Sequence, residues 1–87
     1  MVYKVFWADE KARKSFERLS PMLQPRVLKA LQKISDDPRP AGSKKLQGRP
    51  AGAWRVRIGD YRLIYDIDDK AKTVVLIDLG PRRNIYR

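Results

Sequence analysis

Hydrophobic and polar positions alternate with a period of two along residues 53–67, AWRVRIGDYRLIYDI. This alternation is typical of half-buried β-strands, and Gly59-Asp60 in the middle of the stretch suits a two-residue type II′ turn. Pairing across that turn places Arg57 opposite Arg62. The stretch therefore predicts a β-hairpin with one apolar face and one basic face.

The two faces of this hairpin differ sharply in chemistry. The apolar face would carry Trp54, Val56, Ile58, Tyr61, Leu63, Tyr65 and Ile67. The basic face would carry Arg55, Arg57 and Arg62. Like charges directly opposite one another destabilise a sheet, so Arg57 across from Arg62 indicates an anionic ligand between them. A solvated basic face is the alternative interpretation, because exposed charges repel only weakly in water.

Upstream of the hairpin, the pattern predicts one strand followed by a helix. Residues 2–7 are rich in strand-forming side chains. Asp9 can cap a helix that begins at Glu10. The buried stripe of that helix would consist of Ala12, Phe16 and Leu19.

A second helix is predicted after Ser20-Pro21, where serine can cap and proline suits the first helical position. Its apolar positions, at helical spacing, are Leu23, Val27, Leu31 and Ile34. Pro25 lacks an N–H group and favours a helix that starts near Pro25 itself. The helix should end by residues 36–38.

Residues 38–52 are dense in proline and glycine and predict a loop, with Leu46 as an anchor into the core. Residues 73–79, TVVLIDL, predict an inner strand. The predicted order is β-α-α-β-β-β, an α+β fold in which both helices form a hairpin on one face of a mainly antiparallel sheet. The opposite face would be basic and uncovered. We expect residues 1–87 to form a single domain.

Charge and composition narrow the function. The 87 residues include 20 Lys+Arg and 10 Asp+Glu, a net charge of +10, which favours a polyanionic partner such as nucleic acid. There is no cysteine or histidine, so a metal site would rest on carboxylates alone, and we expect neither metal nor cofactor. No apolar run approaches a membrane span, and the N-terminus is too short for a signal peptide, which predicts a cytoplasmic protein.

The candidate site residues are mostly cations near the hairpin. They are Lys44, Lys45, Arg49, Arg55, Arg57, Arg62, Arg82, Arg83 and Tyr86. Guanidinium groups suit phosphates, and a tyrosine can stack on a base. Cleavage of RNA would also need a general base and a general acid. Unless the carboxylate of Asp60 or Asp78 contributes, these would have to be Tyr, Lys or Arg side chains, whose ordinary pKa values lie near 10 or above.

Three linked motifs, K-L-x-G, W-R-x-R-x-G-D-Y-R-x-I-Y and R-R-x-x-Y, run through the second half of the chain. In this order the chain resembles the RelE/ParE superfamily of toxins. The resemblance implies a type II toxin that is held inactive by an antitoxin wrapped around it. RelE-like members enter the ribosomal A site and cut mRNA by attack of the 2′-hydroxyl, whereas ParE-like members poison DNA gyrase.

The resemblance also implies roles for individual residues. Arg62 matches the arginine that stabilises the phosphate, Arg82 matches a stabiliser and proposed acid, and Tyr86 matches the tyrosine that stacks on or helps activate the nucleotide. Arg55 and Arg57 stand where the best-studied branch has lysines, one of them a proposed base. Because arginine is a far poorer base than lysine, this departure predicts weak cleavage.

Two further departures lie in the tail. Pro81 stands where many relatives have His or Lys, and the tail is one residue shorter, so Arg82 and Arg83 compete for one role. The prediction is a metal-independent, ribosome-dependent mRNA endonuclease. The alternatives are a gyrase inhibitor on the same scaffold and a non-catalytic module that binds RNA or an acidic antitoxin.

Overall fold

The computed structural model describes residues 2–47 and 52–81, and these residues form one five-stranded sheet with two helices. In chain order the elements are β1 (Lys4–Trp7), α1 (Glu10–Glu17), α2 (Leu23–Asp36), β2 (Lys44–Lys45), β3 (Trp54–Ile58), β4 (Tyr61–Asp68) and β5 (Thr73–Pro81). The strand order across the sheet is β1-β5-β4-β3-β2. The predicted α+β class is therefore confirmed.

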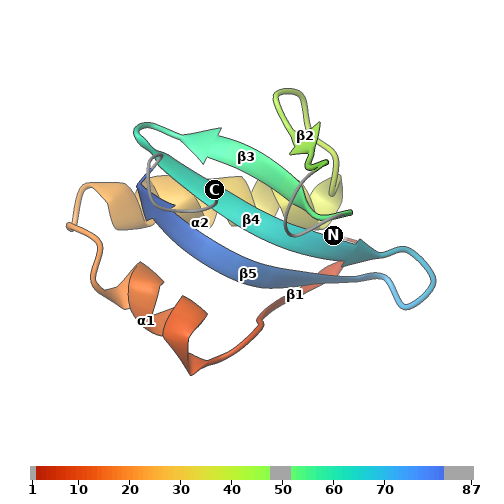
Figure 1. The fold of residues 1–87 in the computed structure, drawn as a ribbon, viewed down its shortest axis with the longest axis horizontal. Helices are drawn as coiled ribbons and strands as arrows, with labels where there is room; N and C mark the ends of the chain where they lie inside the picture. Colours follow the sequence, from red (N-terminus) through yellow and green to blue (C-terminus); the bar gives the residue numbers. More distant parts are fainter. Residues whose placement is uncertain (1, 48–51, 82–87) are drawn as a thin grey trace.

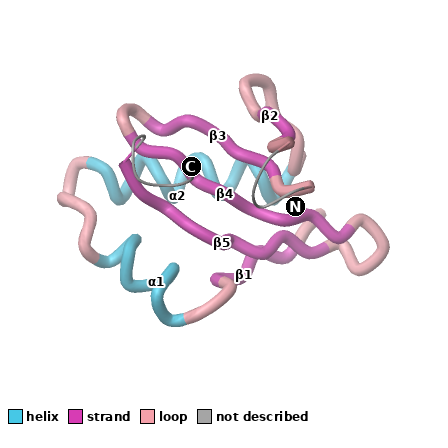
Figure 2. Tube along the Cα trace, in the orientation of Figure 1, coloured by secondary structure: helices cyan, strands magenta, loops and turns pink. Residues whose placement is uncertain are grey.

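The sheet is antiparallel except at one edge, where β1 runs parallel to β5. A parallel pair needs a long crossover connection, and the helices lie within the chain that links the two strands. Figure 1 shows α2 running behind the sheet and α1 packed near the β1–β5 edge, and the tube in Figure 2 shows the same layers. The helices thus cover one face, as predicted. Neither described helix is long and apolar enough to span a membrane.

The strands differ from the prediction at several points, one of which is that β5 continues to Pro81 instead of ending at Leu79. The segment 38–52, predicted as a loop, contains β2, in which Lys44 pairs with Arg55 and Lys45 pairs with Trp54. A strand of two residues is too short to show a hydrophobic period in the sequence. Residues 44 and 45 form a strand because they pair with β3. The first strand also begins at Lys4 rather than at residue 2.

The start of α1 follows the prediction, whereas α2 starts between the two predicted points. Asp9 caps α1, and its Oδ1 accepts a hydrogen bond of 2.8 Å from the backbone N–H of Ala12. The Ser20 carbonyl accepts the N–H of Leu23, where α2 begins. Pro25 is thus the third residue of α2, a position whose N–H would have no partner within the helix. The missing N–H therefore does not delay the helix, and the expected start near Pro25 was two residues late.

The register of the central hairpin matches the prediction. Ile58 pairs with Tyr61 and Arg57 pairs with Arg62 across the turn. Gly59 has a φ of 60°, while Asp60 is not among the residues with positive φ. This is the pattern of a type II′ turn, in which only the first central residue needs a positive φ.

The main core lies between the sheet and the helices. Its buried members are Tyr3, Leu19, Val27, Ile34, Ile58, Leu63, Tyr65, Val74, Leu76 and Leu79. Trp54 and Tyr61 pack against them, so both belong to the core as expected. The Tyr65 hydroxyl donates a hydrogen bond of 2.7 Å to the Pro38 carbonyl, which satisfies the one polar atom of that buried side chain.

A second, smaller cluster lies on the opposite face of the sheet. It joins Leu46, Ala53 and Ile64, which are 8%, 0% and 1% exposed, with Ile77 packed against them. Leu46 is an anchor, as predicted, but it covers the face away from the helices. The expectation of a wholly uncovered basic face was therefore wrong, because the hairpin places the apolar Ile64 beside Arg55 and that side chain must be buried.

Candidate functional site

The basic residues of the hairpin gather on the sheet face away from the helices. Arg57 pairs with Arg62, and Arg62 pairs in turn with Gly80 of β5. Arg55 lies on the same face, in the next row, beside Ile64. We call Arg55, Arg57 and Arg62 the arginine face. It has the composition predicted from the alternation of the sequence.

The three arginines differ in exposure. Arg57 is exposed, whereas Arg55 and Arg62 are half-buried, and the Nε atom of Arg62 is shielded from solvent. Gly80 has no side chain, so within the described part of the chain no side chain from this position of β5 lies beside Arg62. A half-buried guanidinium held in a strand is better preorganised than one on a flexible exposed stem, and such a cation can stabilise charge that develops on a phosphate.

The two lysines of β2 point to different faces. Lys44 pairs with Arg55 and therefore extends the arginine face, whereas Lys45 pairs with Trp54 and lies on the helix side of the sheet. The structure thus brings Lys44, and not Lys45, to the predicted site. Sequence alone placed both there because it did not predict β2.

The other predicted site residues are Arg49, Arg82, Arg83 and Tyr86, and all four lie outside the described residues. The described part of β5 ends at Pro81, directly after Gly80.

Few groups able to carry protons lie on the arginine face as described. Asp78 occupies the same row as Ile64, and its Oδ1 accepts a hydrogen bond of 2.8 Å from the Leu79 N–H. Asp78 forms no ion pair with a described arginine. Tyr65 is in the core, where burial raises its pKa to about 12. The described residues of this face can therefore bind and stabilise anions but are poor proton acceptors.

Elsewhere, the strongest electrostatic cluster is structural. The Asp69 carboxylate accepts hydrogen bonds from Arg39, at 2.9 Å, and from the Tyr3 hydroxyl, at 2.7 Å. These two donors, Arg39 foremost, lower the pKa of Asp69 to about 2. No group of carboxylates among the described residues could hold a metal ion.

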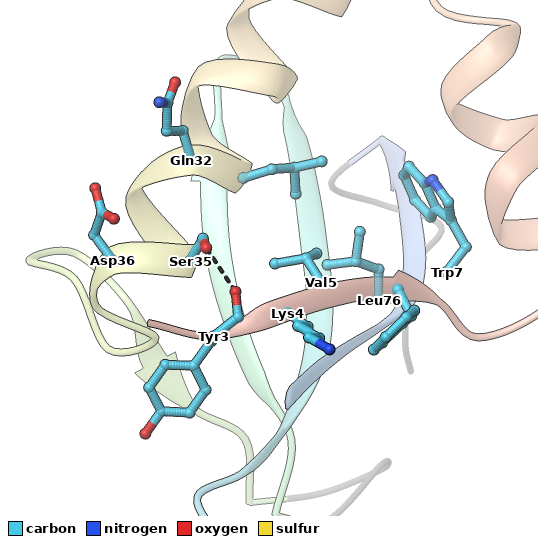
Figure 3. Close-up of a pocket in the computed structure, with 10 residues that line it drawn as sticks. Tyr3, Lys4, Val5, Trp7, Gln32, Ser35, Asp36 and Leu76 are labelled. Atoms are coloured by element: carbon cyan, nitrogen blue, oxygen red, sulfur yellow. Dashed lines mark hydrogen bonds between the residues drawn. The ribbon is translucent and has the colours of Figure 1, made fainter. Parts of the chain in front are cut away.

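A hollow of about 590 Å³ lies between the edge strand β1 and α2 and is mostly apolar. Figure 3 shows Val5 and Leu76 in its middle, Trp7 at one end and Tyr3 at the other. The Ser35 hydroxyl of α2 donates a hydrogen bond of 2.6 Å to the Tyr3 carbonyl and ties the helix to the strand there. This hollow was not predicted, because β1 had no assigned neighbour in the sequence analysis.

A second hollow, about 390 Å³, lies between α2 and β3. Its charged lining consists of Arg26, Lys29 and Lys33 from α2 and Arg57 from β3. Sequence analysis did not single out the three helix cations. Their spacing of three and four residues, which places them on one side of a helix, was the signal that could have identified them.

A family model with the description "ParE toxin of type II toxin-antitoxin system, parDE" matches residues 8–86. The chain belongs to this toxin family. Within the wider RelE/ParE superfamily its relatives are RelE-like, and the chain is a type II toxin. The resemblance inferred from the three motifs is confirmed.

Two curated relatives illustrate the similarity. The chain is 38% identical over 77 residues to toxin RelG of Mycobacterium tuberculosis, covering 87% of each chain. It is 31% identical over 75 residues to the mRNA interferase toxin RelE of Escherichia coli, covering 85% of this toxin and 78% of the relative.

Solved structures agree with this assignment. The toxin is similar to a chain of the archaeal RelE–RelB complex from Pyrococcus horikoshii, with a TM-score of 0.83, 28% identity, and coverage of 98% of this toxin and 100% of that chain. It is also similar to a chain of the RelBE2 toxin–antitoxin complex from M. tuberculosis, with a TM-score of 0.79, 32% identity, and coverage of 94% and 100%.

Proposed function

We propose that this toxin is a metal-independent endoribonuclease that cuts mRNA in the ribosomal A site. The observation that carries the proposal is the cross-strand pair of Arg57 and Arg62 on the face away from the helices, with Gly80, which has no side chain, beside Arg62. Two adjacent guanidinium groups repel one another unless an anion lies between them, and a scissile phosphate is such an anion. The naming of the E. coli relative as an mRNA interferase supports the same conclusion.

Each residue of the proposed site would have a separate task. Arg62 would stabilise the negative charge of the phosphorane that forms when the 2′-hydroxyl attacks. Arg82 would stabilise the same charge and protonate the leaving 5′-oxygen, and Tyr86 would stack on the nucleotide. Arg55 and Arg57 would hold the backbone of the RNA on either side.

Ribosome dependence follows from the weak acid–base chemistry of this set. The arginine face supplies cations, but its described residues provide no group suited to remove a proton at neutral pH. Alignment of the 2′-hydroxyl with the phosphate by the ribosome would supply the missing acceleration through orientation. A cytoplasmic location is part of the proposal, since ribosomes are found there.

The test is a toxicity assay combined with primer extension on translated mRNA. The double variant Arg62→Ala, Arg82→Ala should abolish growth arrest and leave mRNA uncut. Lys44→Ala and Lys45→Ala form a matched pair, because they are adjacent, equal in charge and on opposite faces. Lys44→Ala should reduce cleavage, whereas Lys45→Ala should not. Full arrest by the double variant would show that the site is assigned wrongly.

Gyrase inhibition is the second candidate, and the ParE description of the matching family model favours it. Induced cells distinguish the two functions. Cleaved mRNA supports the endoribonuclease, whereas trapped gyrase–DNA breaks with intact mRNA support the gyrase inhibitor. If arrested cells contain neither cleaved mRNA nor trapped gyrase–DNA breaks, the remaining alternative is the non-catalytic binding module.

We also propose that an acidic antitoxin wraps the toxin and holds it inactive. The net charge of +10 favours an acidic partner, and the similar solved chains come from toxin–antitoxin complexes. The apolar hollow beside the edge strand β1 suits an extended segment of such a partner. Co-expression of the cognate antitoxin should restore growth, and a toxin that still arrests cells in its presence would contradict this assignment.

A further inference from the structure

The hollow between α2 and β3 is a groove of uniform charge. We define the basic groove by its four cations, Arg26, Lys29, Lys33 and Arg57, all of which are exposed. The rest of its lining is apolar or small and consists of Ala30, Pro40, Ala41, Val56, Ile58 and Gly59. Among the residues that the structure describes, no carboxylate and no aromatic ring lines the groove. A groove of this kind attracts anions along its whole length.

The helix sets out three of these cations in a line. Arg26, Lys29 and Lys33 follow one another at intervals of three and four residues, so they share one side of α2 and span about 10 Å along its axis. At one end of the line the Arg26 guanidinium lies over the hairpin turn. Its Nη1 atom is 3.4 Å from the point that a Cβ atom on Gly59 would occupy. A Cβ atom there would be in ordinary van der Waals contact with the arginine, so Arg26 packs against the turn.

These charges are not neutralised within the described part of the chain. The ion pairs found there join Arg13 to Glu10 and Glu17, and Arg39 to Asp69. Lys29 and Lys33 are a like-charged pair one turn apart, an arrangement that weakens a helix slightly. A line of cations that repel one another and have no internal partner fits an anionic ligand from outside.

We propose that the basic groove binds the phosphate backbone of RNA outside the strand that is cut. Arg57 belongs both to this groove and to the arginine face, so the two cationic surfaces meet at the outer edge of β3. Beyond Arg55 no described strand pairs with that edge, because β2 pairs only with Trp54 and Arg55. A single polyanion could therefore contact both surfaces.

The lining of the groove also indicates how the RNA would be recognised. Without an aromatic side chain the groove cannot stack bases, so its contacts would be to phosphates and independent of sequence. An acidic peptide is the less suitable ligand, because peptides gain affinity from large apolar anchors in pockets. The hollow with the more apolar lining lies at the other edge of the sheet, beside β1. The proposed function places the toxin in the ribosomal A site, so this RNA would be ribosomal RNA. That identification rests on the proposed function, whereas the binding of RNA by the groove does not.

The test compares two triple variants with equal changes in net charge. The groove variant is Arg26→Gln, Lys29→Gln, Lys33→Gln. The control variant is Lys11→Gln, Lys14→Gln, Arg18→Gln, which removes three exposed cations from the region of α1. Binding of each protein to a short RNA duplex is measured by fluorescence anisotropy over a series of salt concentrations. Circular dichroism and urea unfolding check that both variants fold.

The groove variant should bind the duplex about tenfold or more weakly at moderate salt, and the slope of log affinity against log salt should fall by about 2. The control variant should change both quantities far less. Equal losses in the two variants would mean that net charge alone matters, which overturns the proposal. Unchanged duplex binding together with weaker antitoxin binding would assign the groove to a peptide and also overturn it.

Failure of this proposal is distinguishable from failure of the proposed enzyme activity. Arg62→Ala should lose mRNA cleavage while it retains the salt-dependent contribution of Arg26, Lys29 and Lys33 to duplex binding. If the wild-type toxin cuts no mRNA but the groove variant still shows the smaller slope of log affinity against log salt, the proposal of RNA binding by the groove is supported and the proposed endoribonuclease activity is refuted.

Discussion

The two faces of the β3–β4 hairpin are built from alternate residues of the same strands, yet the apolar side chains of one face and the arginines of the other differ in burial. Toward the helices, Leu63 and Tyr65 are 0% exposed. Away from the helices, Arg57 is exposed, and its neighbour Arg62 is only half-buried. The strands therefore present an apolar core toward the helices, and on the other side accessible arginines beside the small buried cluster of Ile64.

This difference separates stability from function. The helix face provides the apolar burial that drives folding. The arginine face keeps two cations side by side, which weakens the sheet slightly and prepares it for an anion. Substitutions on the two faces should consequently affect different properties, and the following experiments test that separation from the largest expected effect to the smallest.

The largest contrast should come from Leu63→Ala and Arg62→Ala, adjacent residues that face opposite sides. Leu63→Ala should lower the free energy of unfolding by about 3 kcal/mol, because it removes a fully buried side chain and leaves a cavity. Arg62→Ala should change stability by less than about 1 kcal/mol while it removes activity. Urea denaturation and the toxicity assay measure the two effects. Equal destabilisation by both variants would refute the separation.

A smaller effect is expected for one buried hydrogen bond of the helix face. Tyr65→Phe removes the hydroxyl that donates to the Pro38 carbonyl and should lower the free energy of unfolding by about 1 kcal/mol. Tyr61→Phe is the control, since Tyr61 is half-buried in the same strand and its hydroxyl has no hydrogen-bond partner among the described residues. A control variant as unstable as Tyr65→Phe would mean that this bond is not the cause.

On the arginine face, Arg57→Glu should stabilise the toxin while it removes activity. The new carboxylate would lie directly across from Arg62 and replace a repulsion by an attraction, which should raise the free energy of unfolding by about 0.5 kcal/mol. Arg57→Gln should give an intermediate stability. Urea denaturation measures the free energy of unfolding, which should fall in the order Arg57→Glu, Arg57→Gln, wild type. The reverse order would show that the two arginines do not repel one another in the free toxin.

The smallest effect concerns pH and the cluster of Asp69, Arg39 and Tyr3. The folded-state pKa of Asp69 is lowered from 3.8 to about 2, so its contribution to stability is present above pH 4 or so and is lost as the pH falls through about 2. The difference in unfolding free energy between wild type and Asp69→Asn should therefore be constant near neutral pH and shrink in acid. Urea midpoints at several pH values measure it, and a difference that persists below pH 2 or so would contradict the shift.

The hairpin shows how far sequence reasoning can go. Its register, its turn and the two sets of side chains follow from local alternation and from one glycine, because a period of two assigns each residue to a face once the turn is located. The apolar stripes of the helices followed from the helical spacing of their residues, and Val27 and Ile34 are buried as predicted.

Other features depended on partners distant in the chain. Lys44 and Lys45 became a strand only because β3 offered an open edge, and that pairing sent the two lysines to opposite faces. The burial of Ile64 required Leu46 and Ala53 to fold over it. The bulge between β4 and β5, which sets Ile64 against Asp78 and Tyr65 against Leu76, has no local signal in either strand.

The sequence by itself determined the elements other than β2, the apolar and basic sides of the hairpin, and the family of toxins to which the chain belongs. Only the tertiary structure decided that β1 lies parallel to β5 at one edge, that a small apolar cluster covers part of the basic side, and that α2 and β3 together form the basic groove. Local patterns report which side of an element is apolar, because that depends on periodicity alone. Which elements meet depends on how all the apolar surfaces are buried at once, and no single stretch of sequence contains that information.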